Sequence, residues 1–251
     1  VPQALRRLGP TVRRLLSAGC EVGLLCHPQL AGYPAYLGSY NYERQKQIIT
    51  EGADIWSDAL GEAPVTFRPG FFSANDYTFH VLCMLGFTQG SCSLPGRIDN
   101  EQCSMWFNSY PFAHHTNPLD RTAAGTMEFF EVPVTSDFGA ASYISYETFT
   151  PAHLRIEEPD IHDYARDLIA RHIKATAEDN VEPRTVQFVT TNVVRWGAAD
   201  DPHVERLENL CSMVREVADE HGLELCPSSL AEAHRAADDA LPAIEDDPAD
   251  P

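Results

Sequence analysis

A chain of 251 residues can bury one sizeable hydrophobic core but is short for two independent ones, so we expect a single domain. Hydrophobic residues make up 43% of the chain, which is typical of a globular protein and disfavours disordered and collagen-like classes. Asp and Glu number 37 against 18 Lys and Arg, and the resulting formal charge of -19 disfavours nucleic acid and anionic membrane surfaces as partners.

Residues 1–19 show the apolar periodicity of an amphipathic helix that ends at Gly19, a residue suited to a left-handed helix end. Arginines interrupt this segment, so it has the pattern of neither a secretory signal nor a membrane span. The seven cysteines form an odd set without a C-x-x-C pair, which favours reduced thiols. We therefore expect a cytoplasmic location for the chain as given, an expectation that a segment missing from its front would change.

The next part of the chain alternates between strand and helix patterns. Residues 21–26 read EVGLLC, a short apolar run typical of a strand buried on both faces, and the proline of His27-Pro28 ends it. The elements expected after it are a helix over 41–60 ended by Gly61, a strand over 65–67, a helix over 76–85 capped by Asn75 and a strand over 87–92. Pro, Gly, Asn and His punctuate residues 93–127, which we expect to form a functional loop.

The second half continues the same alternation. We expect strands over 129–134, 185–194 and 223–226, helices over 160–178 and 202–221, and a last helix whose capping box pairs Ser229 with Glu232. Strands that alternate with helices at this spacing predict an α/β fold, with functional residues at the carboxyl ends of parallel strands. His27, Arg68 and Asn192 lie at or near such ends.

Several of these segments together resemble the polysaccharide deacetylase family, whose shared unit is the NodB-homology domain. The resemblance rests on EVGLLCHPQ, on FRPGFFSANDYTFHVLCMLGF, on FFEVPV and on the segments from TVQFVTTNVV to CPSSLAEA, and it covers most of residues 1–237. It implies one distorted (β/α) barrel domain over 1–237 that holds a divalent metal, zinc in most relatives, and hydrolyses N-acetyl groups on amino sugars. Residues 238–251 are acidic and are expected to be a disordered tail.

The resemblance also implies roles for three residues of this chain. His27 matches the second histidine of the family's metal site, whereas the first would fall on Leu25 or Gly23, and neither can bind metal. Arg68 matches the arginine that orients a catalytic aspartate, and Phe71 matches the position whose backbone N–H stabilises the oxyanion.

Other parts of the family pattern are altered or missing. Thr190, Thr191 or Asn192 stands where the family has its terminal histidine. The chain opens on a helix, so the family's first strand, which carries paired aspartates, would precede residue 1 and the barrel would lack it. Such a barrel would expose strand edges, from which we expect a marginally stable or homo-oligomeric chain.

Each residue also has a structural interpretation. His27 can be a strand-end histidine bonded to backbone, Arg68 a surface arginine paired with a carboxylate, and Phe71 a core or sugar-stacking ring. His114 and His115 point in different directions with no nearby carboxylate at a ligand spacing, so we expect them to be solvated in their loop. No P-loop or G-x-G-x-x-G fingerprint is present, which disfavours a nucleotide cofactor.

Two functions follow from these observations. The first is a metal-dependent deacetylase acting on an amino-sugar polymer, a hydrolase of non-peptide carbon–nitrogen bonds. The second is a catalytically inactive relative that binds carbohydrate with a degenerate metal site. In both cases the expected partner is a carbohydrate, with neither nucleic acid nor membrane involved.

Overall fold

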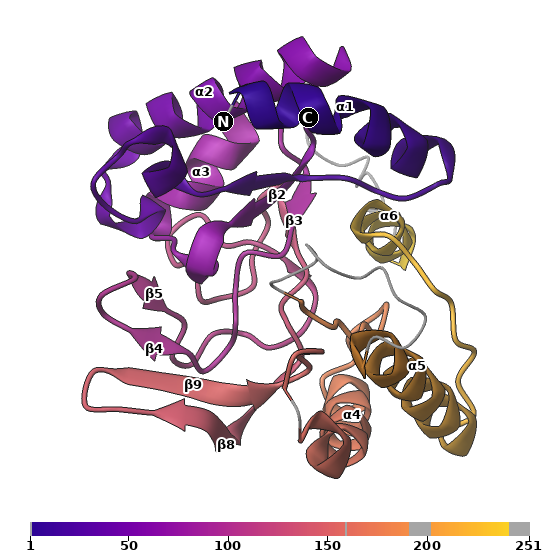
Figure 1. Cartoon of the computed structure of the whole chain (residues 1–251). Coiled ribbons are helices and arrows are strands. Elements are labelled where there is room, and N and C mark those ends of the chain that lie inside the picture. The colour runs from indigo at the N-terminus through magenta and orange to yellow at the C-terminus, as the bar shows by residue number, and fades with distance from the viewer. Residues whose placement is uncertain (1, 159, 191–201, 241–251) are drawn as a thin grey trace, which may run out of the picture.

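Helices and short strands alternate as far as Gly90, a run of strands that ends in a long hairpin follows, and three helices complete the described part of the chain (Figure 1). The structure, a computed structural model, describes residues 2–158, 160–190 and 202–240. The helices are α1 (Pro2–Ser17), α2 (Tyr42–Leu60), α3 (Asp76–Met84), α4 (Ile161–Glu178), α5 (Pro202–Glu220) and α6 (Leu230–Ala240), with 3-10 helices η1 (Pro28–Ala31), η2 (Leu37–Ser39) and η3 (Gly70–Phe72). The strands are β1 (Leu24–Cys26), β2 (Thr66–Pro69), β3 (Gln89–Gly90), β4 (Ile98–Asp99), β5 (Ser104–Met105), β6 (His114–His115), β7 (Phe130–Glu131), β8 (Ser136–Ile144) and β9 (Thr148–His153).

These strands form two sheets, and the fold is mixed α/β. One sheet has the order β1-β2-β3-β7-β6, in which the first four strands are parallel and β6 is antiparallel to β7. The other has the order β5-β4-β9-β8 and is antiparallel throughout. The parallel arrangement of β1, β2 and β3, which helices connect, confirms what the alternation of elements predicts, whereas no helix lies between β3 and β7.

Within the described part of the chain, helices cover one face of the parallel sheet at β1 and β2. Phe67 of β2 packs there with Ile49 of α2 and Phe79 of α3 in the largest buried cluster, and α1 lies alongside α2 (Figure 1). Because side chains alternate along a strand, Leu25 and its register partner Arg68 point to the opposite face. Leu25 is 54% exposed, so the expectation that this strand is buried on both faces is wrong.

The expected (β/α) barrel does not close within the described residues. β1 is an edge of its sheet, and a cavity of about 760 Å³ is lined by β1 and β2 together with residues 186–188 and 227–230. The strands expected over 185–194 and 223–226 are absent from the described part: Val189 forms only an isolated bridge with Arg155, and residues 191–194 lie outside that part. A strand needs backbone hydrogen bonds to a neighbouring strand. The cavity lies between β1 and residues 186–188 and 227–230, so β1 does not provide these hydrogen bonds.

Local capping signals place the helices as expected. At the start of α3, Asn75 Oδ1 accepts a hydrogen bond from the backbone N–H of Tyr77, and Thr78 Oγ1 accepts one from the backbone N–H of Asn75, which together form a capping box. Ser229 and Glu232 exchange the same kind of hydrogen bonds before α6. This helix continues to Ala240 and so includes the first residues of the expected acidic tail; the later residues lie outside the described part.

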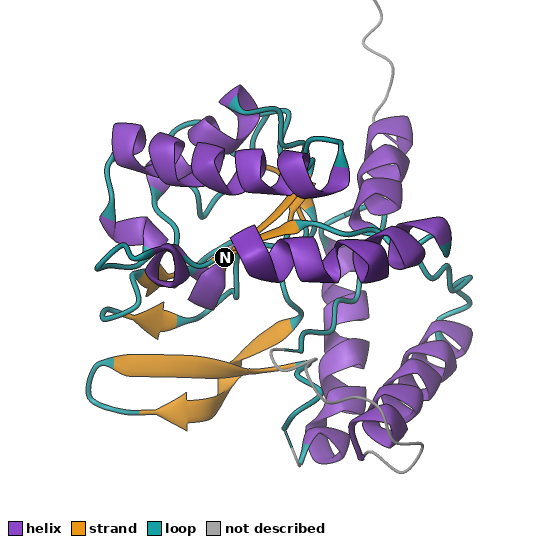
Figure 2. Ribbon diagram, turned by 45° about the horizontal axis from the view of Figure 1, so that its top comes forward, coloured by secondary structure: helices purple, strands orange, loops and turns teal. Residues whose placement is uncertain are grey.

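The β8–β9 hairpin is a feature that sequence periodicity did not predict. It projects from the helical part of the molecule (Figure 2), and β8 is largely exposed from Phe138 to Ile144, so it has no alternating apolar pattern. α4 and α5 pack on each other nearby through Leu168 and Leu210. None of the described helices is long and apolar enough to cross a bilayer.

Candidate functional site

Two segments that the sequence singled out meet at the carboxyl ends of neighbouring strands. His27 follows β1 and Phe71 lies in η3, which follows β2, and the register pairs Cys26 with Pro69. The imidazole of His27 lies against Gly70, where an added Cβ would be 2.2 Å from Nδ1. Only glycine at position 70 leaves room for the observed position of His27.

His27, Tyr36 and Phe71 form a group of aromatic rings that we call the aromatic ledge. The ring centroids of His27 and Phe71 are 5.2 Å apart at 87°, and those of Tyr36 and Phe71 are 5.4 Å apart at 89°. These edge-to-face contacts hold the Phe71 ring in place while 45% of the residue stays exposed. Burial lowers the pKa of His27, so its imidazole is neutral at neutral pH.

The backbone of Phe71 and Phe72 is strained. Their φ angles are 59° and 57°, in the left-handed region that bulky residues rarely adopt. Such conformations cost about 1 to 3 kcal/mol each and persist only where neighbouring groups hold them. Trp106 is one such group, because its indole Nε1 donates a hydrogen bond of 2.7 Å to the Phe72 carbonyl. The guanidinium of Arg68 is another, lying 5.5 Å from the centroid of the Phe72 ring.

Two substitutions of Trp106 should distinguish the contribution of its packing to stability from the contribution of its hydrogen bond. Trp106 is fully buried, so Trp106→Ala is expected to lower the free energy of unfolding by about 3 to 5 kcal/mol. Trp106→Phe retains most of the packing and should lower it by about 1 to 2 kcal/mol, because the Phe72 carbonyl loses its donor. Urea denaturation measures both effects.

Trp56 offers a matched control for that experiment. It is 5% exposed, and its Nε1 has no hydrogen-bond partner among the described residues. Trp56→Phe should therefore have a smaller effect than Trp106→Phe. Equal effects of the two substitutions would contradict a role for the Trp106 hydrogen bond in holding Phe72.

Arg68 has partners other than the catalytic aspartate that the resemblance implies. Its Nε donates to the Ser91 carbonyl at 3.0 Å and its Nη2 to Ser91 Oγ at 2.6 Å. No ion pair joins Arg68 to a carboxylate among the residues that the structure describes. Burial lowers the pKa of the guanidinium, which nevertheless stays charged at neutral pH.

Glu131 is a buried carboxyl group beside these strand ends that sequence reasoning missed. It is 1% exposed and accepts hydrogen bonds from the backbone N–H groups of Cys92 and Ser93 and from Ser93 Oγ, at 2.8 to 3.0 Å. Burial raises its pKa to about 7, although these donors act in the opposite direction. The sequence feature that could have identified Glu131 is the presence of an acidic residue inside the apolar run FFEVPV. Its complete enclosure indicates that it holds the 92–93 segment in place and does not contact a substrate.

Two of the hollows in the described part of the chain are candidate ligand sites. The cavity beside β1 presents Arg68, Ser91 and Gln187 among its lining residues, with Glu21 and Glu232 also lining it. It therefore combines cationic, hydroxyl and amide groups with the exposed face of the parallel sheet.

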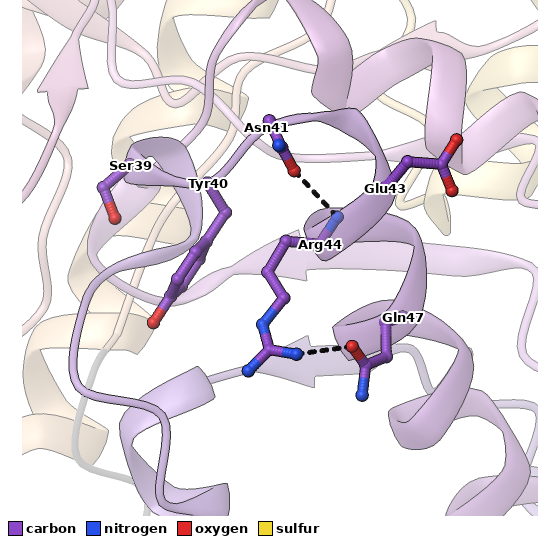
Figure 3. Close-up of a pocket in the computed structure, with 6 residues that line it drawn as sticks. All are labelled: Ser39, Tyr40, Asn41, Glu43, Arg44 and Gln47. Carbon is purple, nitrogen blue, oxygen red and sulfur yellow. Dashed lines mark hydrogen bonds between the residues drawn. The ribbon is translucent and has the colours of Figure 1, made fainter.

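The other hollow, of about 630 Å³, lies at the start of α2 (Figure 3). Its polar groups are paired with one another: Asn41 Oδ1 accepts from the Arg44 N–H at 3.0 Å, and Arg44 Nη1 donates to Gln47 at 2.6 Å. These contacts cap and brace the helix, which makes this hollow the weaker candidate.

The described residues around His27 do not fit the metal that the resemblance implies. Leu25 offers no ligand atom, and a side chain at Gly23 would bring its Cβ within 2.8 Å of the Thr66 carbonyl oxygen. Among the described residues, no group of three His, Cys, Asp or Glu includes His27. Thr191 and Asn192 lie outside the described part of the chain. Zinc at His27 stays a prediction from the resemblance alone.

His114 and His115 are not solvated in a loop as expected, because they form β6. His114 is 7% exposed and its Nδ1 donates to the Phe112 carbonyl. His115 lies within 3.0 Å of a carboxylate oxygen of Asp238, a neighbour that the sequence spacing did not reveal. His115 pairs with Phe130 and His114 with Glu131 of β7, and β6 is the edge strand of this sheet opposite β1.

No family model and no curated protein matches the chain. Among solved structures, the chain is similar to a crystal structure described as "putative polysaccharide deacetylase" from Mycobacterium smegmatis. The sequence identity is 15%, the match covers 91% of this chain and 74% of the other, and the TM-score is 0.47. That likeness decides neither fold nor function, which depend on the residues of this chain.

Proposed function

We propose that this chain is a carbohydrate-binding relative of the polysaccharide deacetylases and that it holds an N-acetylated amino-sugar polymer against the aromatic ledge. The observation that carries the proposal is the strained backbone of Phe71 and Phe72. Strain of this kind is concentrated at functional sites, where a less strained arrangement would lose the required geometry. Here it accompanies a large apolar ring that is 45% exposed at the end of β2.

The chemistry of the ledge suits a sugar. A pyranose ring has an apolar C–H face that can pack on an aromatic ring, while its hydroxyl groups remain free to form hydrogen bonds at the rim. The neutral imidazole of His27 can donate one hydrogen bond and accept another. The formal charge of -19 repels an anionic polymer, whereas a polymer of N-acetylglucosamine is uncharged.

Removal of the N-acetyl group is a second candidate function, favoured by the contact between His27 and Gly70. This contact joins two of the segments on which the resemblance to the deacetylases depends. In the reaction, water adds to the acetamide carbonyl carbon and the carbon–nitrogen bond breaks, which releases acetate and leaves a free amine. A carboxylate base and further metal ligands beside His27 would be needed, and the described residues do not supply them.

Substitution of Phe71 tests the binding proposal. Phe71→Gly removes the exposed ring and relieves the left-handed strain, so we expect a chain that is as stable as the wild type or more stable by about 1 kcal/mol. Its affinity for a chito-oligosaccharide should fall about tenfold or more, which corresponds to at least about 1.4 kcal/mol. Calorimetric titration measures the affinity, and urea denaturation measures the stability.

Phe138 offers a matched control, since it is the same residue type, is 44% exposed and lies on β8. Phe138→Ala should bind the oligosaccharide as the wild type does, whereas Phe71→Ala should not. Equal affinities of these two variants would refute the ledge as the binding site. Acetate release that requires added zinc and is lost in His27→Ala would establish the hydrolytic function in its place.

A further inference from the structure

Three side chains of metal-binding types converge between α6 and β6, the edge strand of the first sheet opposite β1, and none of them belongs to the aromatic ledge. They are His115 of β6 and His234 and Asp238 of α6, and their ligand atoms all lie within 4.8 Å of one another. His115 Nε2 is 3.0 Å from Asp238 Oδ1, and His234 Nε2 is 3.5 Å from Asp238 Oδ2. This is the one such group of three among the residues that the structure describes.

The local structure explains why these residues meet. His234 and Asp238 are four positions apart on α6, so they lie on the same face of the helix. The imidazole of His234 stacks on Phe130 with a centroid distance of 4.9 Å and an interplanar angle of 1°. His115 is the register partner of Phe130 in the neighbouring strand, which brings its ring beside that of His234, at 5.3 Å.

Hydrogen bonds at the far side of each ring set which nitrogen faces the carboxylate. His115 Nδ1 is 2.9 Å from the Met127 carbonyl oxygen, which can only accept, so Nδ1 carries the hydrogen. His234 Nδ1 is 3.3 Å from Gln89 Oε1, which is likewise an acceptor. Both Nε2 atoms therefore present lone pairs toward Asp238. Metal-binding histidines are typically oriented by a hydrogen bond of this kind at the other ring nitrogen.

Three lone-pair donors that face one another repel unless a proton or a metal cation lies among them, and a metal cation can be shared by all three. Ligands at about 2.0 to 2.2 Å from a tetrahedral zinc ion are about 3.3 to 3.6 Å from one another. The separations of 3.0 and 3.5 Å from Asp238 are close to that spacing, and all three ligand atoms lie within 4.8 Å of one another, so small side-chain movements would complete the site. Two imidazoles and one carboxylate are also a donor set that zinc and related divalent metals prefer.

We propose that His115, His234 and Asp238 bind a divalent transition metal of the zinc class and that this metal fastens α6 to the sheet. The fourth position of a tetrahedral site would be open to water, because Asp238 is 52% exposed at its side chain. This proposal is independent of glycan binding, since none of the three ligands belongs to the aromatic ledge.

A fastening role fits the packing of α6. In the cluster that joins this helix to the sheet, α6 contributes the buried side chains of Ala233 and Ala237 and one partly buried residue, Leu230. Alanine buries little apolar area, so this contact contributes less than a leucine-rich interface would. A metal that links β6 to α6 supplies the stabilisation that the packing lacks.

Zinc titration of the full chain, first stripped of metal with a chelator, tests the proposal. We expect one Zn²⁺ per chain by calorimetry, together with a thermal midpoint that rises by about 5 to 10 °C at zinc concentrations roughly 100-fold above Kd. Asp238→Asn preserves side-chain volume at an exposed position and should weaken zinc binding at least roughly tenfold. His234→Ala should abolish the zinc-dependent rise of the midpoint.

Asp239→Asn is the matched control, because it makes the same change of charge at the next, exposed position of α6. It should bind zinc as tightly as the wild type. Cys20, Cys211 and Cys226 are exposed and could bind zinc on their own, but such binding would survive Asp238→Asn. Equal zinc affinities of Asp238→Asn and Asp239→Asn, or no zinc binding by the wild-type chain, would overturn the proposal.

Discussion

Acidification from pH 7 to pH 4 is expected to unfold the chain, because three buried histidines resist protonation. His114, His153 and His172 are 3% to 8% exposed, and each donates a ring hydrogen to a backbone carbonyl. Burial lowers the pKa of each from 6.5 to about 4, while the hydrogen bond to the carbonyl acts in the opposite direction. In the unfolded chain the same imidazoles regain their ordinary pKa.

The sign of the effect follows from proton binding. Between pH 6.5 and pH 4 the unfolded chain binds more protons at these histidines than the folded chain, so stability falls as the pH falls. Lowering the pKa of one histidine by this amount reduces the free energy of unfolding at pH 4 by about 3 kcal/mol, and the three histidines together reduce it by about 10 kcal/mol. That sum is comparable to the whole free energy of unfolding of a typical domain, about 5 to 15 kcal/mol.

Glu131 opposes this trend but does not reverse it. Its raised pKa makes the folded chain bind the extra proton, so its contribution increases as the pH falls from about 7 to 4.5. The raised pKa of this one group stabilises the folded chain by about 3 kcal/mol, which is less than the loss of about 10 kcal/mol caused by the three histidines. Urea midpoints followed by circular dichroism from pH 7.5 to pH 4 should decrease steadily, and His153→Gln should flatten the decrease. A midpoint that does not change over this range would contradict the assignment of these histidines as neutral.

Replacement of Glu131 by alanine is the substitution expected to destabilise the chain most strongly. It removes the acceptor for Cys92 N–H, Ser93 N–H and Ser93 Oγ in a place that water does not reach. Each buried donor left without a partner costs about 1 to 3 kcal/mol, so we expect a loss of at least about 3 kcal/mol. Because Ser91 precedes this segment and binds Arg68, the strand ends next to the aromatic ledge should lose order as well.

Glu131→Gln provides the comparison that separates hydrogen bonding from charge. The glutamine keeps one oxygen acceptor and cannot titrate, so it should be less destabilising than alanine. The stability of the wild type relative to Glu131→Gln should increase as the pH is lowered from about 7 to 4.5. If the difference between the two chains were the same at pH 7.5 and pH 5, the raised pKa of Glu131 would be disproved.

Local features of the sequence were sufficient to predict most helices. Asn75 predicted the start of α3 and Gly61 the end of α2, because a side-chain cap and a left-handed glycine act within one turn of the helix. The parallel order of β1, β2 and β3 follows from the helices that connect them. His27 and Gly70 meet for the same reason, since they end two strands joined by one helix.

Contacts between distant segments required the tertiary structure. His115 and Asp238 are far apart in sequence, so no ligand spacing could reveal their proximity. Leu25 belongs to an apolar run that predicts burial, and only the position of β1 at a sheet edge leaves it exposed. The sequence by itself determined the capped helices and the residues that end the parallel strands, because caps and strand periodicity are local. Only the tertiary structure decided which faces are covered and which side chains converge, because those depend on packing across the chain.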